Sequence, residues 1–246
     1  MKGKNHLSLL LILSLAWVCT TVNARTYAVC VGLSDYPGTV NDLVVSANDA
    51  LSMQRLIQAN DPSAVVVVLT NRNATLSRVK AAMQRVFLAA GPQDDIVFFF
   101  SGHGLKGSFV CYDGRLTYNS ILAALGRSRA RSKVVYADAC YAGNIRQNTG
   151  KANSKTPKNV MFFLSSRNNE KSAERRGASN SVFTSLLLTA LNGAADTNHD
   201  RVVTAVELFN YVHGQLNERS RSQHAVMWGH FDRNMPVMWL GAGGRR

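Results

Sequence analysis

Two short apolar segments of this chain each run into a residue that could take part in catalysis. Residues 95–100 lead into His103, and residues 133–137 lead into Cys140. Apolar runs bounded by Gly and polar residues are typical of buried strands in a parallel sheet, and open α/β sheets bind ligands beyond the carboxyl ends of their strands. The sequence therefore predicts that an imidazole and a thiol meet at one edge of a sheet, as a cysteine-nucleophile enzyme requires.

The rest of the chain alternates strands with amphipathic helices. This alternation predicts an α/β protein, a three-layer α/β/α sandwich with a mainly parallel central sheet of about six strands. The helix after the second strand shows a core-facing stripe at three-and-four spacing, made of Leu76, Val79, Met83, Val86 and Ala90. The expected strands cover residues 26–33, 64–69, 95–100, 109–112, 133–137 and 159–164. Other helices are expected over 43–59, from the cap Thr117 through Leu125, over 180–191 and over 204–217.

Residues 1–24 have the features of a secretory signal peptide, with two lysines, an apolar stretch and small side chains before a cut after Ala24. The apolar stretch, Leu7 to Val18, is too short to span a bilayer. We therefore expect an exported protein, secreted or periplasmic, with one domain over 25–246 and no stable membrane span after removal of the signal.

The chain is strongly basic, with 28 Lys and Arg against 15 Asp and Glu. Acidic polymers or anionic surfaces are compatible partners, but a soluble basic surface explains the charge more simply, and no specific nucleic-acid partner is expected. No Gly-rich phosphate loop, paired CxxC or HExxH motif occurs.

Three cysteines follow the expected signal, and an odd number leaves at least one free thiol. Cys30 and Cys111 lie in strand-like segments, where they would be buried thiols or a disulfide with each other. Taken alone, Cys140 could also be a structural thiol, and His103 a turn residue without a role. Their joint placement at strand ends, each beside glycines that allow close substrate approach, favours catalysis.

These residues resemble the caspase-like cysteine peptidases, and among them the metacaspase branch. The resemblance rests on the histidine of Ser-Gly-His-Gly at 101–104 and the cysteine of Asp-x-Cys-x-x-Gly at 138–143. Animal caspases carry Gln-Ala-Cys-x-Gly with the histidine about 50 residues upstream. Here Asp138 replaces the Gln, and the histidine lies 37 residues before the cysteine.

The resemblance implies that Cys140 forms the acyl-enzyme while His103 polarises the scissile carbonyl or protonates the leaving amine. Gly104 and Cys140 would donate backbone N–H groups to the oxyanion. It also implies a large-subunit-like part (25–145), an exposed basic linker (146–158) and a small-subunit-like part (159–246).

Charge predicts the specificity of the expected substrate pocket. Its residues, matched to the family, are Ser46, Asp49, Ser101 and Asp138. Two carboxylates in one pocket favour a guanidinium or ammonium group, so the expected substrates are peptides or proteins cleaved after Arg or Lys, and not after Asp. The alternative roles are a helix N-cap for Asp49 and a loop cap for Asp138.

Basic residues shortly after the nucleophile suggest self-processing by an enzyme of this specificity, although a solvated loop explains them equally well. They are Arg146, Lys151, Lys155 and Lys158. Two further functions stay open at this stage. One is a catalytically idle caspase-like module that binds partners through its basic surface, and the other is a cysteine-dependent transpeptidase or ligase.

No cofactor is required by this chemistry, but residues 196–207 have the spacing of a calcium-binding EF-hand loop. The expected metal ligands are Asp196, Asn198, Asp200, Val202, Thr204 and Glu207. Arg201 stands where such a loop has Gly. The alternative is a Thr204-x-x-Glu207 capping box that opens the last helix and needs no metal.

Overall fold

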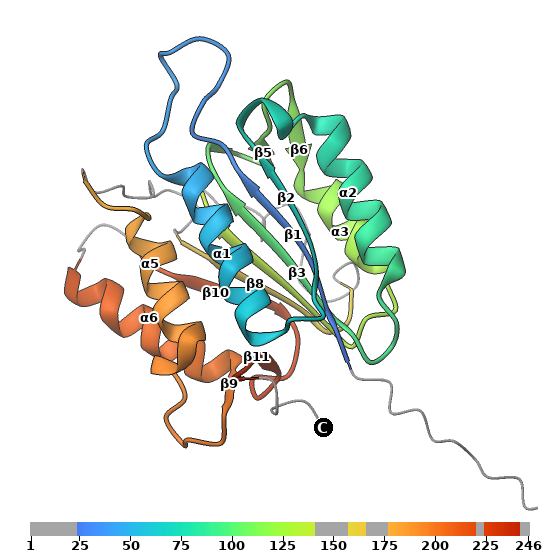
Figure 1. The fold of residues 1–246 in the computed structure, drawn as a ribbon, viewed down its shortest axis with the longest axis vertical. Helices are drawn as coiled ribbons and strands as arrows, with labels where there is room; N and C mark the ends of the chain where they lie inside the picture. The colour runs from blue at the N-terminus through green and yellow to red at the C-terminus, as the bar shows by residue number, and fades with distance from the viewer. Residues whose placement is uncertain (1–23, 141–156, 166–176, 220–223, 242–246) are drawn as a thin grey trace, which may run out of the picture.

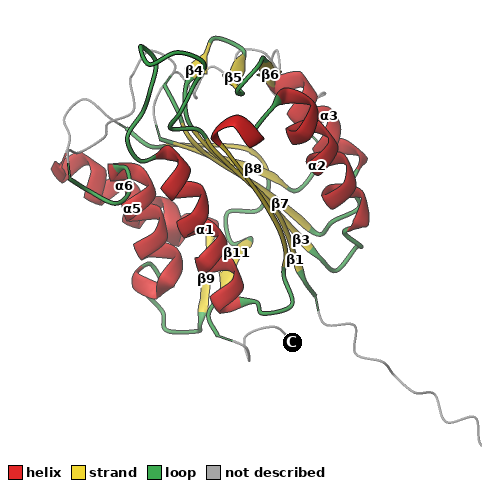
Figure 2. Cartoon of the chain, turned by 45° about the horizontal axis from the view of Figure 1, so that its top comes forward, coloured by secondary structure: helices red, strands yellow, loops and turns green. Residues whose placement is uncertain are grey.

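The computed structural model describes residues 24–140, 157–165, 177–219 and 224–241. Its centre is a six-stranded sheet flanked by helices on both faces (Figures 1 and 2). The strand order is β10-β8-β7-β3-β1-β2, and every neighbouring pair is parallel except the edge strand β10, which runs antiparallel to β8. The sheet consists of β1 (Thr26–Gly32), β2 (Val65–Thr70), β3 (Asp95–Ser101), β7 (Ser132–Asp138), β8 (Val160–Leu164) and β10 (Val226–His230). The predicted three-layer α/β/α fold is confirmed.

Helices α1, α5 and α6 cover one face of the sheet, and α2 and α3 cover the other (Figure 2). Their bounds are α1 (Ser46–Asn60), α2 (Leu76–Ala89), α3 (Tyr118–Arg127), α5 (Val182–Thr189) and α6 (Ala205–Arg219). Short helical turns occur at η1 (Asn71–Asn73) and η3 (Ala190–Ala194). In the part of the chain that is described, no helix combines the length and apolarity that a membrane crossing requires.

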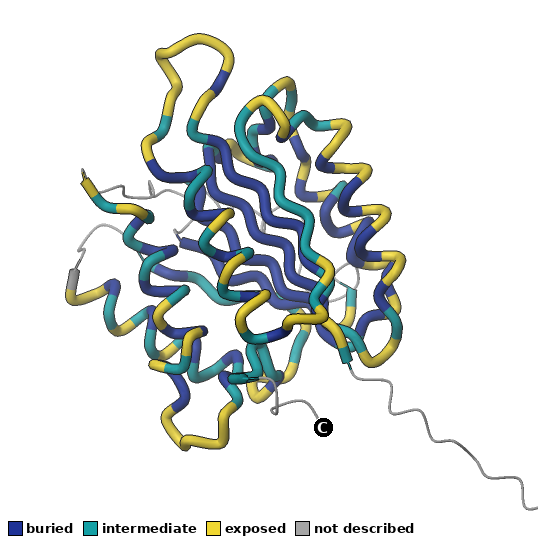
Figure 3. Tube along the Cα trace, in the orientation of Figure 1, coloured by how far each residue is buried: buried dark blue, intermediate teal, exposed yellow. Residues whose placement is uncertain are grey.

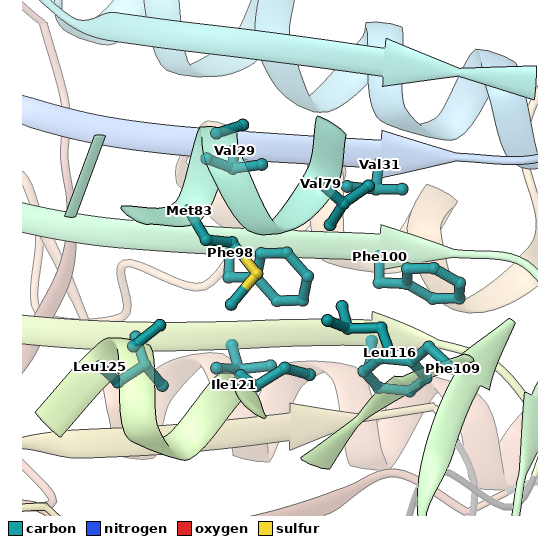
Figure 4. Packing of buried hydrophobic residues seen from close by; sticks show 14 of the residues in the cluster. Val29, Val31, Val79, Met83, Phe98, Phe100, Phe109, Leu116, Ile121 and Leu125 are labelled. Carbon is teal, nitrogen blue, oxygen red and sulfur yellow. The ribbon is translucent and has the colours of Figure 1, made fainter. Parts of the chain in front are cut away.

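The central strands are buried on both faces, as Figure 3 shows. Because successive side chains of a strand point to opposite faces, Phe98 and Phe100 enter the core under α2 and α3, and Val97 and Phe99 enter the core under α1, α5 and α6. Figure 4 shows Phe98 beside Met83 of α2, and Phe100 near Phe109, against whose ring it stacks with the centroids 4.4 Å apart. The continuous apolar run of β3 therefore follows from its position at the centre of a parallel sheet.

The caps and stripes of the helices agree with their sequence. The side chain of Thr117 accepts a hydrogen bond from the backbone N–H of Ser120 at 3.2 Å, so it caps α3 as predicted. In α2, the predicted stripe is largely buried at Val79, Met83 and Val86. Leu76 is only partly buried and packs at the edge of the same core.

One predicted strand lies outside the central sheet. Ser108–Val110 forms β5 of a small antiparallel sheet with β4 (Gly104–Leu105) and β6 (Arg115–Thr117). A parallel neighbour for β3 would need a crossover of a dozen or more residues, and the segment from Ser101 to Ser108 is too short for one. The sixth strand of the central sheet is instead β10, which the sequence did not reveal. A second small sheet joins β9 (Val202–Thr204) to β11 (Pro236–Trp239).

Candidate active site

The parallel register brings the ends of β1, β3 and β7 to the same level. Gly32 is the register partner of Ser101, and Ser101 is the register partner of Asp138. Beyond the paired residues, the N–H of Gly102 donates to the carbonyl of Asp138 at 3.1 Å, so the two chain segments remain adjacent as they leave the sheet. The turn after β3 carries His103, and the turn after β7 carries Cys140.

His103 and Cys140 line one pocket of about 70 Å³. The other lining residues are Leu43, Ser46, Ser101, Gly102, Asp138 and Ser181. Gly104 lies directly against the turn of the cysteine, because a Cβ added to Gly104 would stand 2.0 Å from the carbonyl oxygen of Cys140. Only glycine allows this approach of the two backbones.

The loop between β1 and α1 orients the imidazole of His103. The backbone N–H of His103 donates to the hydroxyl of Tyr36 at 2.9 Å, and the two rings lie with their centroids 4.8 Å apart. The Nε2 atom lies 2.7 Å from the carbonyl oxygen of Asn41. A carbonyl oxygen only accepts, so this hydrogen bond requires a proton on Nε2 and leaves Nδ1 as the basic nitrogen of the neutral ring.

Cys140 differs from the other two described cysteines in its accessibility. Cys30 and Cys111 are buried and free, so the disulfide considered between them does not form. Burial raises the pKa of each of these thiols to about 12, which keeps them protonated and unreactive at neutral pH. Cys140 is partly exposed and opens to the pocket.

Asp49 lies behind the pocket and is fully buried, with an exposed fraction of 0%. One carboxylate oxygen accepts a hydrogen bond from the hydroxyl of Ser101 at 2.8 Å. The other accepts from the side-chain amide of Asn180 at 2.8 Å and from the backbone N–H of Ser181 at 3.1 Å. The proposed N-cap role of Asp49 is wrong, because Val45 occupies the N-cap of α1 and Asp49 lies within its first turn.

Asp138 lies at the end of β7 with an exposed fraction of 4%. Its carboxylate accepts hydrogen bonds from the hydroxyls of Ser181 and Thr184, the latter at 2.9 Å. Burial, and then the charge of Asp138, raise the pKa of Asp49 to about 7. Asp138 thus lines the pocket, and Asp49, whose charge repels that of Asp138, lies behind the pocket residue Ser101.

The start of α5 supplies partners of both carboxylates that the sequence did not single out, namely Asn180, Ser181 and Thr184. Ser181 is the N-cap of α5, and its hydroxyl also accepts from the backbone N–H of Thr184. A helix that follows a parallel strand begins at the carboxyl edge of the sheet. The N-cap serine of α5 is therefore the sequence feature that could have indicated partners for the two carboxylates. The loop residues Tyr36 and Asn41 carried no comparable signal.

The other predicted site residues fall into two groups. Ser46 begins α1 and lines the pocket, together with Ser101. The expected metal ligands, 196–207, lie at the opposite end of the molecule, between α5 and α6 (Figure 1). The Gly143 end of the cysteine motif and the basic residues at 146, 151 and 155 lie outside the described residues, whereas Lys158 lies within them and is exposed.

Comparison with known proteins identifies the family. The model of the caspase domain, Peptidase_C14, matches residues 25–236, and the chain belongs to this family of cysteine peptidases. The resemblance seen in the His103 and Cys140 motifs is therefore confirmed at the level of the family.

Two solved structures share the fold. Protein GSU0716 from Geobacter sulfurreducens superposes with a TM-score of 0.66 at 18% identity, covering 88% of this chain and 99% of its own. Caspase-1 from Spodoptera frugiperda gives a TM-score of 0.67 at 12% identity, covering 89% of this chain and 92% of its own. No curated protein matches the sequence.

The support of Asp138 by Thr184 can be tested by stability. Thr184→Val keeps the side-chain shape but removes a hydrogen bond to a buried carboxylate, so we expect the free energy of unfolding to fall by about 1.5–3 kcal/mol. Thr189→Val on the exposed side of the same helix is the control and should change it by less than about 0.5 kcal/mol. Urea denaturation measures both, and equal stabilities would contradict this role of Thr184.

Proposed function

We propose that this protein is a secreted or periplasmic cysteine endopeptidase that cleaves peptide bonds after Arg or Lys. The observation that carries the proposal is the shared pocket, in which a partly exposed thiol and an oriented imidazole lie beside the buried carboxylate of Asp138, while the buried carboxylate of Asp49 is hydrogen-bonded to the pocket residue Ser101. The fold and family support the cysteine peptidase class. Export is proposed from residues 1–24, of which all but Ala24 lie outside the described residues.

In the proposed reaction, the thiol of Cys140 gives its proton to Nδ1 of His103, its sulfur bonds to the scissile carbonyl carbon, and the carbonyl electrons move onto oxygen. Backbone N–H groups of Gly104 and Cys140 are proposed to stabilise this oxyanion. Collapse of the intermediate breaks the C–N bond, and His103 gives the leaving amine its proton. Water then attacks the thioester, which releases the acid and regenerates the thiol.

The electrostatics of the pocket favour a basic side chain. Asp49 receives hydrogen bonds from a hydroxyl, a side-chain amide and a backbone N–H, all of them neutral. The one salt bridge found among the described residues joins Arg131 to Asp95, away from the pocket. A substrate guanidinium or ammonium would offset the repulsion between Asp49 and Asp138, whereas a substrate Asp would add to it.

Two other functions would use the same fold. An idle binding module has no need of an accessible thiol beside an oriented imidazole, and the geometry of His103 and Cys140 therefore favours an enzyme. A transpeptidase or ligase would share the acyl-enzyme and differ in the nucleophile that resolves it. Analysis of products in the presence of an added amine acceptor separates hydrolysis from transfer.

The proposed specificity can be tested with matched fluorogenic peptides that end in Arg, Lys, citrulline or Asp. We expect turnover of the Arg and Lys peptides, at least about tenfold weaker turnover of citrulline, which lacks the charge, and none of Asp. The Cys140→Ala variant should be inactive on all four. Preference for the Asp peptide would contradict the acidic pocket, and activity that survives in Cys140→Ala would exclude Cys140 as the nucleophile.

The ionisation of Asp49 should appear in the ratio of kcat/KM for the Arg peptide to that for the citrulline peptide. Because both substrates depend equally on His103 and Cys140, the ionisation of the catalytic pair cancels in this ratio. Since the pKa of Asp49 is raised to about 7, the carboxyl gains its charge as pH rises through 7, and the ratio should increase by about tenfold or more between pH 5.5 and 8.5.

Asp49→Asn provides the control for this titration. The hydroxyl of Ser101 can reverse its hydrogen bond to accept from the new amide, so the pocket geometry is retained. The variant should show a lower ratio that no longer changes near pH 7. A ratio that is independent of pH in the wild-type protein would contradict the proposed role of Asp49.

Self-processing remains part of the proposal because basic residues follow the nucleophile at Arg146, Lys151, Lys155 and Lys158. We expect cleavage within this segment in the wild-type protein and none in Cys140→Ala. Intact-mass analysis of the two purified proteins detects it, and identical masses apart from the substitution would contradict self-processing.

A further inference from the structure

Residues 196–207 follow η3 at the end of the molecule opposite the candidate active site, and they include β9 and the first three residues of α6 (Figure 1). Oxygen-bearing side chains occupy positions 1, 3, 5, 9 and 12 of the loop, and the backbone carbonyl of Val202 occupies position 7. This is the set of oxygen donors with which an EF-hand loop surrounds Ca²⁺. The spacing alone does not establish a site, because a capping box explains part of it.

Arg201 adopts the backbone conformation for which such loops use glycine. Its φ is 67°, in the left-handed region, and its N–H donates to Oδ2 of Asp196 at 3.0 Å. The guanidinium lies beside Gly241, since a Cβ added there would stand 2.8 Å from Nη2 of Arg201. The substitution of Gly by Arg therefore costs backbone strain without preventing the turn.

One oxygen atom of the loop gives evidence for a bound cation that is independent of the residue spacing. Asp196 is 8% exposed, and its Oδ1 atom is buried and has no hydrogen-bond partner among the residues that the structure describes. The other oxygen of the same carboxylate holds the N–H of Arg201, so the group faces the interior of the loop. A buried carboxylate oxygen without a donor is costly, and a metal ion is the ligand that would satisfy it.

The capping box is also present. Glu207 accepts from the N–H of Thr204 at 2.9 Å, and its own N–H lies 3.4 Å from the hydroxyl oxygen of Thr204. The second oxygen of Glu207 accepts from the hydroxyl of Thr197 at 3.0 Å, at position 2 of the loop. The carboxylate of position 12 therefore already reaches the beginning of the loop, and the box and a metal site are compatible.

Within the described residues, no three His, Cys, Asp and Glu side chains are yet gathered as metal ligands, so binding requires the loop carboxylates to draw together. Such closure predicts an affinity in the range of extracellular calcium modules, about 10⁻⁴–10⁻³ M.

We propose that residues 196–207 bind one Ca²⁺ through the side chains of Asp196, Asn198, Asp200, Thr204 and Glu207 and the carbonyl of Val202. The ion would tie the end of η3 to the beginning of α6 and so stabilise the helical layer that also carries Ser181. The oxygen donors, more numerous than the octahedral shell of Mg²⁺ requires of a protein, favour Ca²⁺. This site does not depend on the proposed peptidase activity.

The test is thermal unfolding and calorimetric titration of the protein carrying Cys140→Ala, with CaCl₂ from about 1 µM to about 10 mM and with MgCl₂ for comparison. The inactive background separates binding from any cleavage. We expect saturable binding of one Ca²⁺ and a rise in Tm of about 3 °C or more at a tenfold excess over the half-saturating concentration. The absence of both binding heat and a Tm rise with Ca²⁺ would overturn the proposal.

Variants separate the metal site from the capping box. Glu207→Gln preserves the box, because Gln also caps, but removes a bidentate ligand, so the calcium response should weaken at least about tenfold. Asp196→Asn should weaken it similarly, and the exposed Glu218→Gln on the same helix should leave it unchanged. A response that survives in both loop variants would show calcium bound elsewhere and would overturn the assignment.

Arg201→Gly tests the assignment from the opposite direction. Glycine relieves the left-handed conformation and removes a positive charge near the ion, so this variant should be half-saturated at a lower Ca²⁺ concentration than the parent protein. Loss of the calcium response in Arg201→Gly would contradict the loop as the binding site.

Discussion

The register between β3 and β7 is the constraint on which the candidate active site depends. Ser101 and Asp138 are paired at the ends of these strands, and the two chain segments that follow stay adjacent through the hydrogen bond from Gly102 to Asp138. A shift of one residue would turn every side chain of a strand to the opposite face. It would therefore bury the wrong residues of β3 and separate the turns that carry His103 and Cys140.

The same register places two carboxylates where burial is unfavourable to their charge. Asp49 has a pKa of about 7 in the folded protein, above its ordinary value of 3.8, so the folded state holds this proton more tightly than the unfolded chain does. Its contribution to stability consequently falls as pH rises from about 4 to about 7. A bound basic side chain would favour the ionised form of Asp49. The proposed substrate would therefore offset the loss of stability that results from burying this carboxylate.

The sequence predicted the elements whose patterns arise from local burial, such as the apolar run of β3, the stripe of α2 and the Thr117 cap of α3. It did not predict β10, whose short segment is only partly buried at the sheet edge and contains Gly229. At the candidate site, the sequence also predicted that His103 and Cys140 lie at strand ends on one edge of the sheet, because open α/β sheets bind ligands beyond the carboxyl ends of their strands. The sequence did not predict the partners Ser181 and Thr184, because they lie more than 40 residues from Asp138 and approach it only through tertiary packing. The same holds for Asn180, which lies 131 residues from its partner Asp49.

The central claim is that the thiol and the acidic pocket form one site, and covalent labelling tests it most directly. A peptide with a C-terminal arginyl chloromethyl ketone and its aspartyl counterpart would each be incubated with the protein, and the modified residue would be mapped by mass spectrometry. We expect the arginyl reagent to alkylate Cys140, with loss of chloride, much faster than the aspartyl reagent does, and more slowly after His103→Ala. Equal rates for the two reagents, or modification of Cys30 or Cys111 in place of Cys140, would contradict the account.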